Sequence, residues 1–250
     1  RTIMNKVVII IPSRLEATRL PNKPLKLINN KEMILHVYEA AMNSKSGEVY
    51  VATPNQKIIE IVKKNGGNAV KTSTNHETGT DRVFEVFNNN LGKKPNIILN
   101  VQGDMPNIDP QAISKLVKFM QSNKCDIGTL ASNFRSEKEL ENSNIVKVEV
   151  NGDLSSDKFL QALDFFRDKK ETKNNLYHHV GIYAYTSEAL IKYVKLKRSK
   201  LELERRLEQL RALENNMSIH VGYIKTSPLS VDTEEDLIEV KKLIEKDEKN

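Results

Sequence analysis

The stretch VVIIIPSRLEATRLPNKP, residues 7–24, decides the fold class. Its first five residues are apolar and β-branched without a break, which is typical of a parallel strand buried on both faces. Pro12 ends this run, and Pro21 and Pro24 restrict the backbone of the loop that follows. Ligands of open α/β sheets bind at the carboxyl ends of the strands. We therefore expect a strand at 7–11 that leads into a binding loop.

Strand and helix patterns alternate outward from this stretch as far as residue 121. Strands are predicted at 48–52 and 69–71, and an apolar run predicts another at 96–101. Apolar stripes at helical spacing predict helices at 31–42, 56–65, 81–90 and 110–121. The alternation predicts an α/β fold with a mostly parallel central sheet and helices on both faces.

The second half of the chain has a different pattern. In 146–150, valines alternate with Lys147 and Glu149, which predicts a strand with one face in water. In 179–185, polar side chains share one parity, so one face of that strand could line a site. We expect mixed strands in this part of the chain.

Two helices are predicted near the carboxyl end. Leucines 203, 207 and 210 form one stripe and predict an amphipathic helix at 201–214. Thr233 and Asp236 resemble a capping box and predict a final helix at 233–248.

Composition narrows the class of protein. The 250 residues suit one large α/β domain, and no apolar run approaches the ~20 residues that span a bilayer. The single cysteine excludes a disulfide within the chain and favours the cytoplasm. The net charge of +6 comes from scattered lysines, which favours small anionic substrates over nucleic acid.

Three cations stand in the loop after the first strand: Arg14, Arg19 and Lys23. A triphosphate needs several fixed donors, and the planar arginine fork matches phosphate geometry. No Gly-Lys-Ser/Thr follows, so this is not a Walker loop. The pattern favours a phosphate-binding loop of another kind.

Two aspartates follow expected strand ends or precede a helix. Asp104 comes directly after the 96–101 strand, and Asp232 precedes the last helix. Either carboxylate could hold Mg²⁺ together with phosphate oxygens, or could serve only as a turn or cap residue. The polar loop 76–82 could likewise meet a base or ribose, or only cap a helix.

Six motifs, in chain order, carry a family resemblance: the loop 12–24, 76–82, 102–104, 179–183, 207–211 and 231–233. They closely resemble those of the 3-deoxy-manno-octulosonate (Kdo) cytidylyltransferases, or CMP-Kdo synthetases, from about residue 7 to about 244. The resemblance implies a Rossmann-like nucleotidyltransferase fold in one domain, 1–250. Its nucleotide-binding part would span about 6–130 and 221–250, and its sugar-binding and dimer part about 131–220.

The resemblance also implies a function and partners. The enzyme would transfer CMP from CTP to Kdo, releasing pyrophosphate, for lipopolysaccharide biosynthesis. It would use Mg²⁺, form a homodimer in the cytoplasm, and neither bind nucleic acid nor insert into a membrane.

Roles for single residues follow from the same resemblance. The catalytic residues would be Arg19, Lys23 and Asp104, with Asp104 and Asp232 as metal ligands. The nucleotide would contact Arg14, Thr78, Gly79, Thr80, Arg82 and Gln102. The sugar acid would contact Arg167, His179, Tyr183, Glu208 and Gln209.

The chain departs from the family pattern at Met105, at Pro54 and in 164–170, where Arg167 is kept but a hydroxyl residue and a proline are not. This last change leaves open a related acidic sugar, 8-amino-Kdo or a sialic acid. A nucleotide-binding protein without catalysis is a second alternative, against which the presence of both Asp104 and Asp232 argues.

Overall fold

The computed structural model describes residues 6–155 and 157–250. The chain forms two compact units. The first unit comprises the chain up to Val117 together with Pro228–Asn250, and the second comprises Lys118–Ser227. Helix α4 (Pro110–Ser122) begins in the first unit and ends in the second. The predicted parts were expected to meet near residues 130 and 221, whereas the two units meet at Val117/Lys118 and Ser227/Pro228. What each part binds stays a prediction.

The first unit contains a parallel sheet in the order β5-β4-β1-β6. Its strands are β1 (Val7–Pro12), β4 (Glu48–Thr53), β5 (Ala69–Lys71) and β6 (Ile97–Asn100). Val8, Ile9, Ile10 and Ile11 are fully buried, as expected for the central strand of a parallel sheet. The predicted α/β fold is confirmed here.

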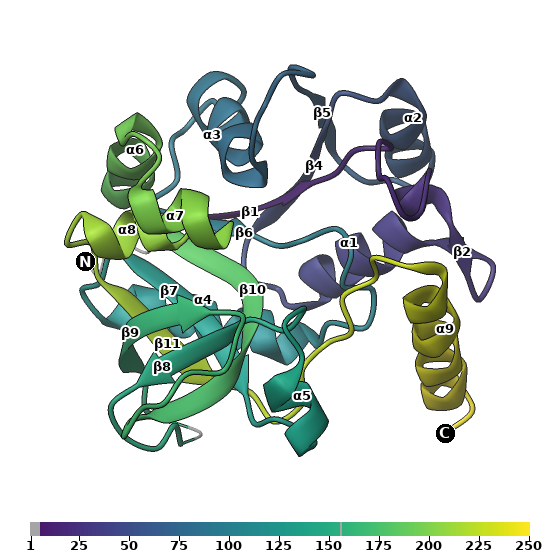
Figure 1. The fold of residues 1–250 in the computed structure, drawn as a ribbon. Coiled ribbons are helices and arrows are strands. Elements are labelled where there is room, and N and C mark those ends of the chain that lie inside the picture. The colour runs from purple at the N-terminus through teal and green to yellow at the C-terminus, as the bar shows by residue number, and fades with distance from the viewer. Residues whose placement is uncertain (1–5, 156) are drawn as a thin grey trace. The chain divides into compact units, whose positions relative to one another are not determined.

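Helices connect these strands in the order that the alternating pattern predicted. They are α1 (Met33–Asn43), α2 (Gln56–Lys64) and α3 (Gly79–Asn89), and Figure 1 shows α1 and α3 on opposite sides of β1. A 3₁₀ turn η1 (Lys23–Leu25) and a small hairpin of β2 (Leu27–Ile28) and β3 (Lys31–Glu32) fill the segment between β1 and α1. Residues 31–32, expected in the helix, therefore form a strand.

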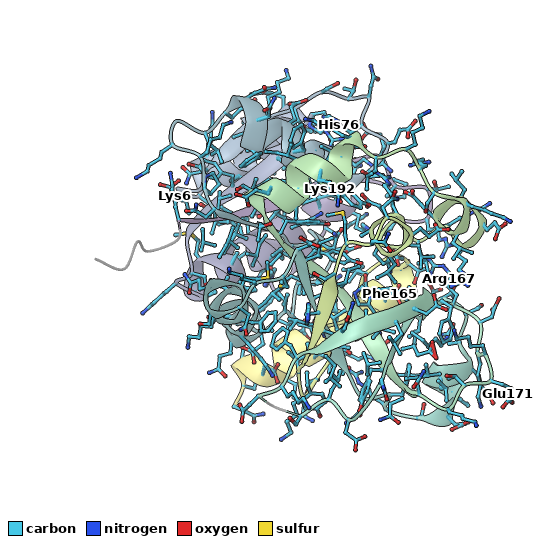
Figure 2. All side chains as sticks on the ribbon, turned by 90° about the vertical axis from the view of Figure 1, so that its left-hand side faces the viewer. Lys6, His76, Phe165, Arg167, Glu171 and Lys192 are labelled. Atoms are coloured by element: carbon cyan, nitrogen blue, oxygen red, sulfur yellow. The ribbon has the colours of Figure 1, made fainter. Side chains whose placement is uncertain are left out.

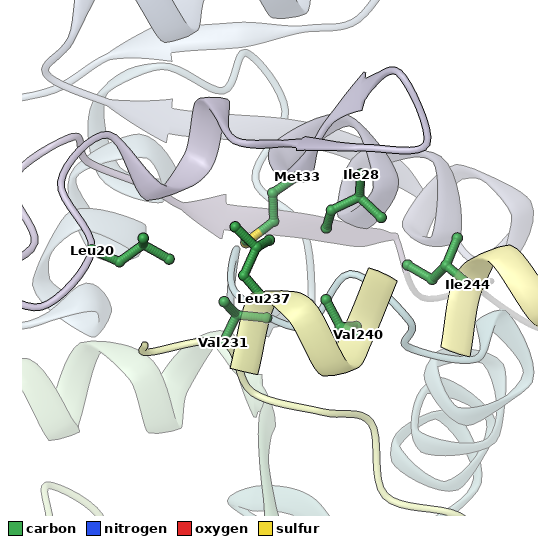
Figure 3. Close-up of a cluster of buried hydrophobic side chains, with 7 residues drawn as sticks. All are labelled: Leu20, Ile28, Met33, Val231, Leu237, Val240 and Ile244. Atoms are coloured by element: carbon green, nitrogen blue, oxygen red, sulfur yellow. The ribbon is translucent and has the colours of Figure 1, made fainter. Parts of the chain in front are cut away.

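Helix α9 (Glu234–Glu248) returns to the first unit. The predicted capping box is present: the Thr233 hydroxyl accepts from the Asp236 amide, and the Asp236 carboxylate accepts from the Thr233 amide at 3.0 Å. Figure 3 shows the buried cluster that fastens the helix, in which residues of both ends of the chain pack together: Leu20, Ile28, Met33, Val231, Leu237, Val240 and Ile244.

The second unit has mixed strands in the order β10-β7-β11-β9-β8, and β8 pairs also with β10. The strand pairings therefore form a closed ring. The strands are β7 (Ile127–Ser132), β8 (Lys147–Val150), β9 (Leu160–Phe166), β10 (Asn175–Thr186) and β11 (Ile219–Tyr223). The mixed strands were expected, but the sequence analysis did not identify β7, β9 or β11.

Short helices complete the second unit: α5 (Glu137–Glu141), α6 (Ser187–Lys195), α7 (Lys200–Arg205) and α8 (Leu210–Glu214). The single helix predicted at 201–214 is wrong, because Arg206 adopts a left-handed conformation (φ 55°) between α7 and α8. The leucine stripe is broken with it: Leu207 and Leu210 are buried, whereas Leu203 is 55% exposed.

The prediction that the strand at 146–150 has one solvent-exposed face is also wrong. All of β8 is buried, including Lys147 and Glu149. The Lys147 ammonium donates to the carbonyls of residues 142, 145 and 167. Glu149 accepts from Thr172 and Asn174 and pairs with Lys170 at 3.0 Å. The segment after β9 covers this polar face, and its backbone and side chains satisfy the charges that water was expected to solvate.

Across the part of the chain that the structure describes, no helix combines the length and apolar character that crossing a membrane requires.

Candidate active site

A cavity of about 320 Å³ opens in the first unit. Its walls come from segments that follow β1, β5 and β6, so it lies at the carboxyl edge of the parallel sheet. The lining residues are Pro12, Ser13, Arg14, Glu16, Ala17, Lys23, Pro24, His76, Glu77, Thr78, Gly79, Arg82, Gln102, Gly103 and Asp104. Seven predicted nucleotide or catalytic residues are thus brought together: Arg14, Lys23, Thr78, Gly79, Arg82, Gln102 and Asp104.

Lys23 lies between the two predicted metal carboxylates. Its Nζ is 3.4 Å from Asp104 Oδ2 and 3.5 Å from Asp232 Oδ1. The side chains of Lys23 and Asp104 are 18% and 24% exposed, and that of Asp232 is 59% exposed. The ammonium therefore stands where a cation can interact with both carboxylates.

Backbone contacts explain why the two aspartates meet. The Val231 amide donates to the Asp104 carbonyl at 2.9 Å, and the Leu229 amide donates to Asn107 Oδ1 at 2.8 Å. These bonds align the segment before α9 with the turn after β6. Asp232 follows at once, and the cap of α9 is Thr233 rather than Asp232.

One carboxylate oxygen of Asp104 lacks a partner in the described chain. This oxygen, Oδ1, is buried and has no hydrogen-bond partner among the described residues. Burial raises the pKa of this carboxyl, Lys23 lowers it, and the charge of Asp232 raises it further. Because nearly all buried polar atoms in native proteins are paired, this oxygen is a position that a water, an ion or a ligand completes.

The Ser13 hydroxyl is a second such atom. Ser13 is 8% exposed and its Oγ is buried without a hydrogen-bond partner in the described chain. Ser13 was not among the predicted site residues, although its position directly after a buried strand was a signal.

Close packing shapes the floor of the cavity at Gly103. A Cβ added there would lie 3.3 Å from the Pro12 carbonyl oxygen and 3.4 Å from Ile34 Cδ1. Glycine therefore lets the turn after β6 approach the end of β1, which brings Gln102 and Asp104 beside the cation loop.

The start of α3 forms another wall. Thr78 is its N-cap and accepts from the Asp81 amide at 3.2 Å. The Arg82 guanidinium donates to the Thr72 hydroxyl at 2.6 Å and the Ser73 carbonyl at 2.7 Å. Burial lowers the pKa of Arg82, and the nearby charge of Arg14 lowers it further. Two arginines thus face the same space, which favours an anion.

His76 lines the cavity as well and was noted only as part of its loop. Its Nε2 is 2.9 Å from Glu85 Oε1, which also accepts from the Ser73 amide at 3.0 Å. The carboxylate fixes the imidazole ring in place.

Two predicted residues do not line this cavity. Thr80 is 2% exposed, and its hydroxyl accepts from Asn100 at 3.5 Å. Arg19 is exposed on the loop outside the cavity lining. The structure thus gives Thr80 a place in the core of the unit and Arg19 a place at its surface.

A second, smaller cavity of about 60 Å³ lies in the second unit. It brings together three of the predicted sugar residues, Tyr183, Glu208 and Gln209. Ile127, Tyr185, Tyr193 and Ile219 complete its lining. Burial raises the pKa of Tyr183 well above its usual value, so its hydroxyl is a neutral hydrogen-bonding group.

His179 and Arg167 lie outside this lining. His179 Nε2 is 2.9 Å from the Thr129 hydroxyl, and the imidazole ring lies 5.5 Å from that of Tyr183. Burial, with a smaller effect of His178, lowers the pKa of His179 to about 3. A register shift in β10 between Val180 and Tyr183 changes the simple alternation that was expected. Arg167 follows β9, two residues beyond Phe165 (Figure 2).

Side chains of the described residues supply few ligands for a metal ion by themselves. The described residues contain no group of three or more His, Cys, Asp or Glu side chains placed to hold an ion. The pair Asp104 and Asp232 fits a hard cation that takes its remaining oxygens from phosphate and water, as Mg²⁺ does.

Comparisons with known proteins agree with this geometry. The cytidylyltransferase family model matches residues 8–219. The 3-deoxy-manno-octulosonate cytidylyltransferase of Bartonella bacilliformis is 42% identical over 96% of this chain and 98% of its own length. The enzyme of that name from Brucella ovis is 42% identical over 93% of each chain.

Solved structures give the same grouping. A CMP:2-keto-3-deoxy-manno-octonic acid synthetase complexed with CTP matches with a TM-score of 0.88 and 35% identity, over 97% of this chain and 99% of that one. A glucose-1-phosphate thymidylyltransferase of Bacillus anthracis matches with a TM-score of 0.66 at 15% identity, over 95% and 94% of the two chains, which shows a shared fold alone. The chain belongs to the cytidylyltransferase family and, within it, to the 3-deoxy-manno-octulosonate cytidylyltransferases.

Proposed function

We propose that the protein transfers CMP from CTP to Kdo, giving CMP-Kdo and pyrophosphate. The observation that carries the proposal is the cation-lined cavity of the first unit, in which Lys23 bridges Asp104 and Asp232. The names of the 42% identical relatives and the CTP complex of the 35% identical structure support the nucleotide and the sugar.

CTP would bind in this cavity through its triphosphate. Arg14, Arg82 and Lys23 supply positive charge, and the amides at the start of α3 favour anions. Arg19 lies on the same loop, where its exposed fork is free to reach a phosphate. Gln102 and Ser13 offer neutral hydrogen-bonding groups for the rest of the nucleotide.

A divalent cation, Mg²⁺, would be held by Asp104 and Asp232. The unpartnered Oδ1 of Asp104 and the closeness of both carboxylates to one ammonium support this fit. When bound, the ion would neutralise charge on the phosphate oxygens and help to orient them.

The reaction is an in-line displacement at the α-phosphorus. The anomeric hydroxyl of the sugar forms the new P–O bond, the bond to pyrophosphate breaks, and the hydroxyl proton is released. Lys23 and Arg19 would stabilise the charge that grows on the phosphoryl oxygens and the leaving group. No covalent enzyme intermediate is required.

The sugar acid would bind in the second unit. Tyr183, Glu208 and Gln209 line its small cavity, with His179 next to Tyr183. Arg167 would pair with the sugar carboxylate. The first unit would thus handle the nucleotide and the second unit the sugar.

The test is pyrophosphate release with each nucleoside triphosphate, with and without Kdo, 8-amino-Kdo or a sialic acid. We expect release only with CTP, Kdo and a divalent cation together. Release with 8-amino-Kdo or a sialic acid but not with Kdo would replace the sugar and keep the reaction. No release with any pair, despite tight CTP binding, would contradict transferase activity.

We also propose that the protein is a cytoplasmic homodimer. The family resemblance supports the dimer, as do the exposed apolar side chains of Leu163, Ile191 and Leu203 in the second unit. A buried cysteine without a disulfide agrees with a reducing compartment. Light scattering at micromolar concentration should give twice the mass of the 28.5 kDa chain, and a monomer mass would refute the dimer.

A further inference from the structure

A buried ion pair joins α7 and α8 in the second unit. Glu202 accepts two hydrogen bonds from Arg211, at 2.9 Å from Nε and 2.6 Å from Nη2. Both side chains are 5% exposed. Glu202 Oε1 also accepts from the Ser199 amide at 2.9 Å in a capping box. One carboxylate thereby fixes the start of α7 and the guanidinium of α8.

The ion pair reaches the wall of the smaller cavity through Tyr193. The guanidinium carbon of Arg211 lies 4.6 Å from the centre of the Tyr193 ring. The Tyr193 hydroxyl donates to the Glu208 carbonyl at 2.9 Å. Tyr193, Glu208 and Gln209 all line the cavity, so contacts run without a break from Glu202 to the cavity wall.

The segment that carries Glu208 and Gln209 is a turn between two short helices. Its carbonyls accept from the Arg211 amide at 3.1 Å and the Ala212 amide at 3.2 Å. Arg206 is left-handed, and Gln209 is the N-cap of α8 without a side-chain cap bond. The Leu207 amide reaches the Glu202 carbonyl at 3.3 Å. These backbone bonds fix the turn, and side-chain contacts through Tyr193 and Arg211 connect it to Glu202.

General energetics indicate that such a pair sets geometry more than stability. Replacing both partners of a buried ion pair by apolar side chains of similar volume is often neutral for stability, because the desolvation cost disappears with the charges. The planar fork of arginine fixes direction in a way that an apolar side chain does not.

We propose that Glu202 and Arg211 are positioning residues that hold Glu208 and Gln209 in the orientation that binds the acidic sugar. This proposal rests on the proposed function of the second unit. Neither residue lines the smaller cavity. Their effect should therefore appear in the affinity for the sugar and not in that for CTP.

The test replaces both charges together. The double variant Glu202→Met/Arg211→Met should fold with a Tm within a few degrees of wild type, since no buried charge is left unpaired. We expect its KM for Kdo to rise at least fivefold, while its KM for CTP stays within twofold. Arg211→Lys keeps the charge but loses the two-pronged geometry, and should raise the KM for Kdo by a smaller factor.

A matched control variant changes an exposed contact between the same two helices. Glu214 of α8 accepts from the Leu201 amide of α7 at 3.2 Å. Glu214→Gln should leave both KM values within twofold of wild type. A folded double variant or Arg211→Lys with the wild-type KM for Kdo would overturn the proposal. So would an equal rise of both KM values. Failure of the wild type to release pyrophosphate with CTP and Kdo would instead overturn the proposed function.

Discussion

Charged side chains have different surroundings in the two units. In the first unit, Lys23 and Asp104 meet at 3.4 Å with partly exposed side chains, and one Asp104 oxygen has no hydrogen-bond partner in the described chain. In the second unit, Glu202 and Arg211 meet at 2.6 Å with both side chains buried and bonded at two points. The first arrangement leaves charge available to a ligand, and the second uses charge to fix the shape of the protein. Substitutions in the two units should therefore have different consequences.

The largest expected effect is at Asp104. Asp104→Asn removes one of the two proposed metal carboxylates, and we expect turnover to fall at least about a thousandfold. The free energy of unfolding should stay the same or increase, because the variant also removes a partly buried charge whose Oδ1 has no hydrogen-bond partner in the described chain. Steady-state kinetics and denaturant unfolding measure the two effects.

The control is Asp109→Asn, which changes an exposed aspartate outside the cavity lining. It should keep full activity. An active Asp104→Asn enzyme would contradict the view that charge in the first unit serves a ligand, whereas charge in the second unit fixes the shape of the protein.

The cation loop should give the next largest effect. Lys23→Met should lower kcat by about a hundredfold and Arg19→Ala by at least about tenfold, since each charge-assisted contact contributes ~1.5–3 kcal/mol. Lys26→Met, on the same segment but outside the cavity lining, is the control. A change confined to the KM for CTP would show that these side chains bind the ground state and the transition state equally.

The pH dependence of the free energy of unfolding should reflect the burial of His179 in the second unit. The pKa of His179 is about 3 in the folded protein and 6.5 ordinarily. Its neutral form is fully favoured above pH 6.5, and the stability that it contributes is lost as the pH falls from 6.5 towards 3. Each pH unit below 6.5 in that window lowers the free energy of unfolding by roughly 1.4 kcal/mol. The loss at pH 5 is therefore about 2 kcal/mol.

The variant His179→Gln cannot take up a proton and should lose less stability between pH 7 and pH 5 than the wild type. Urea unfolding at the two pH values measures the difference. Parallel losses in both proteins would mean that His179 is accessible to protons in the folded state.

The smallest expected effect is at Gln209. Gln209→Ala should raise the KM for Kdo several-fold and leave that for CTP nearly unchanged, because an unpaired polar group on the bound sugar costs ~1–3 kcal/mol. Gln161→Ala on the exposed side of β9 is a control of the same residue type. Equal changes for both substrates, or loss of the dimer, would assign Gln209 to an interface instead of the sugar site.

Sequence reasoning succeeded where local pattern and tertiary environment agree. The strands of the first unit are short, largely apolar runs that alternate with helical patterns, and their positions were predicted within a few residues. Proximity of Arg14, Lys23 and Asp104 also followed, because the carboxyl ends of parallel strands share one edge.

It failed where side chains from distant segments decide the environment. Lys147 and Glu149 alternate with valines as on a half-exposed strand, yet the segment after β9 buries both. The leucines of 201–214 keep helical spacing across the break at Arg206, so spacing alone could not reveal it. The sequence also could not reveal that Lys23 bridges two aspartates. This arrangement depends on the hydrogen bond from the Val231 amide to the Asp104 carbonyl.

The course of the chain through the two units has a consequence for synthesis on the ribosome. The second unit is one continuous segment, whereas the first unit is completed only by Pro228–Asn250. Domains generally fold as units while the chain emerges from its N-terminus. The second unit can therefore fold while α9 is still unmade and Leu20, Ile28 and Met33 lack their partners from that helix. In a growing chain this apolar surface lacks its cover until α9 emerges, and only then can Asp232 reach Lys23 and Asp104.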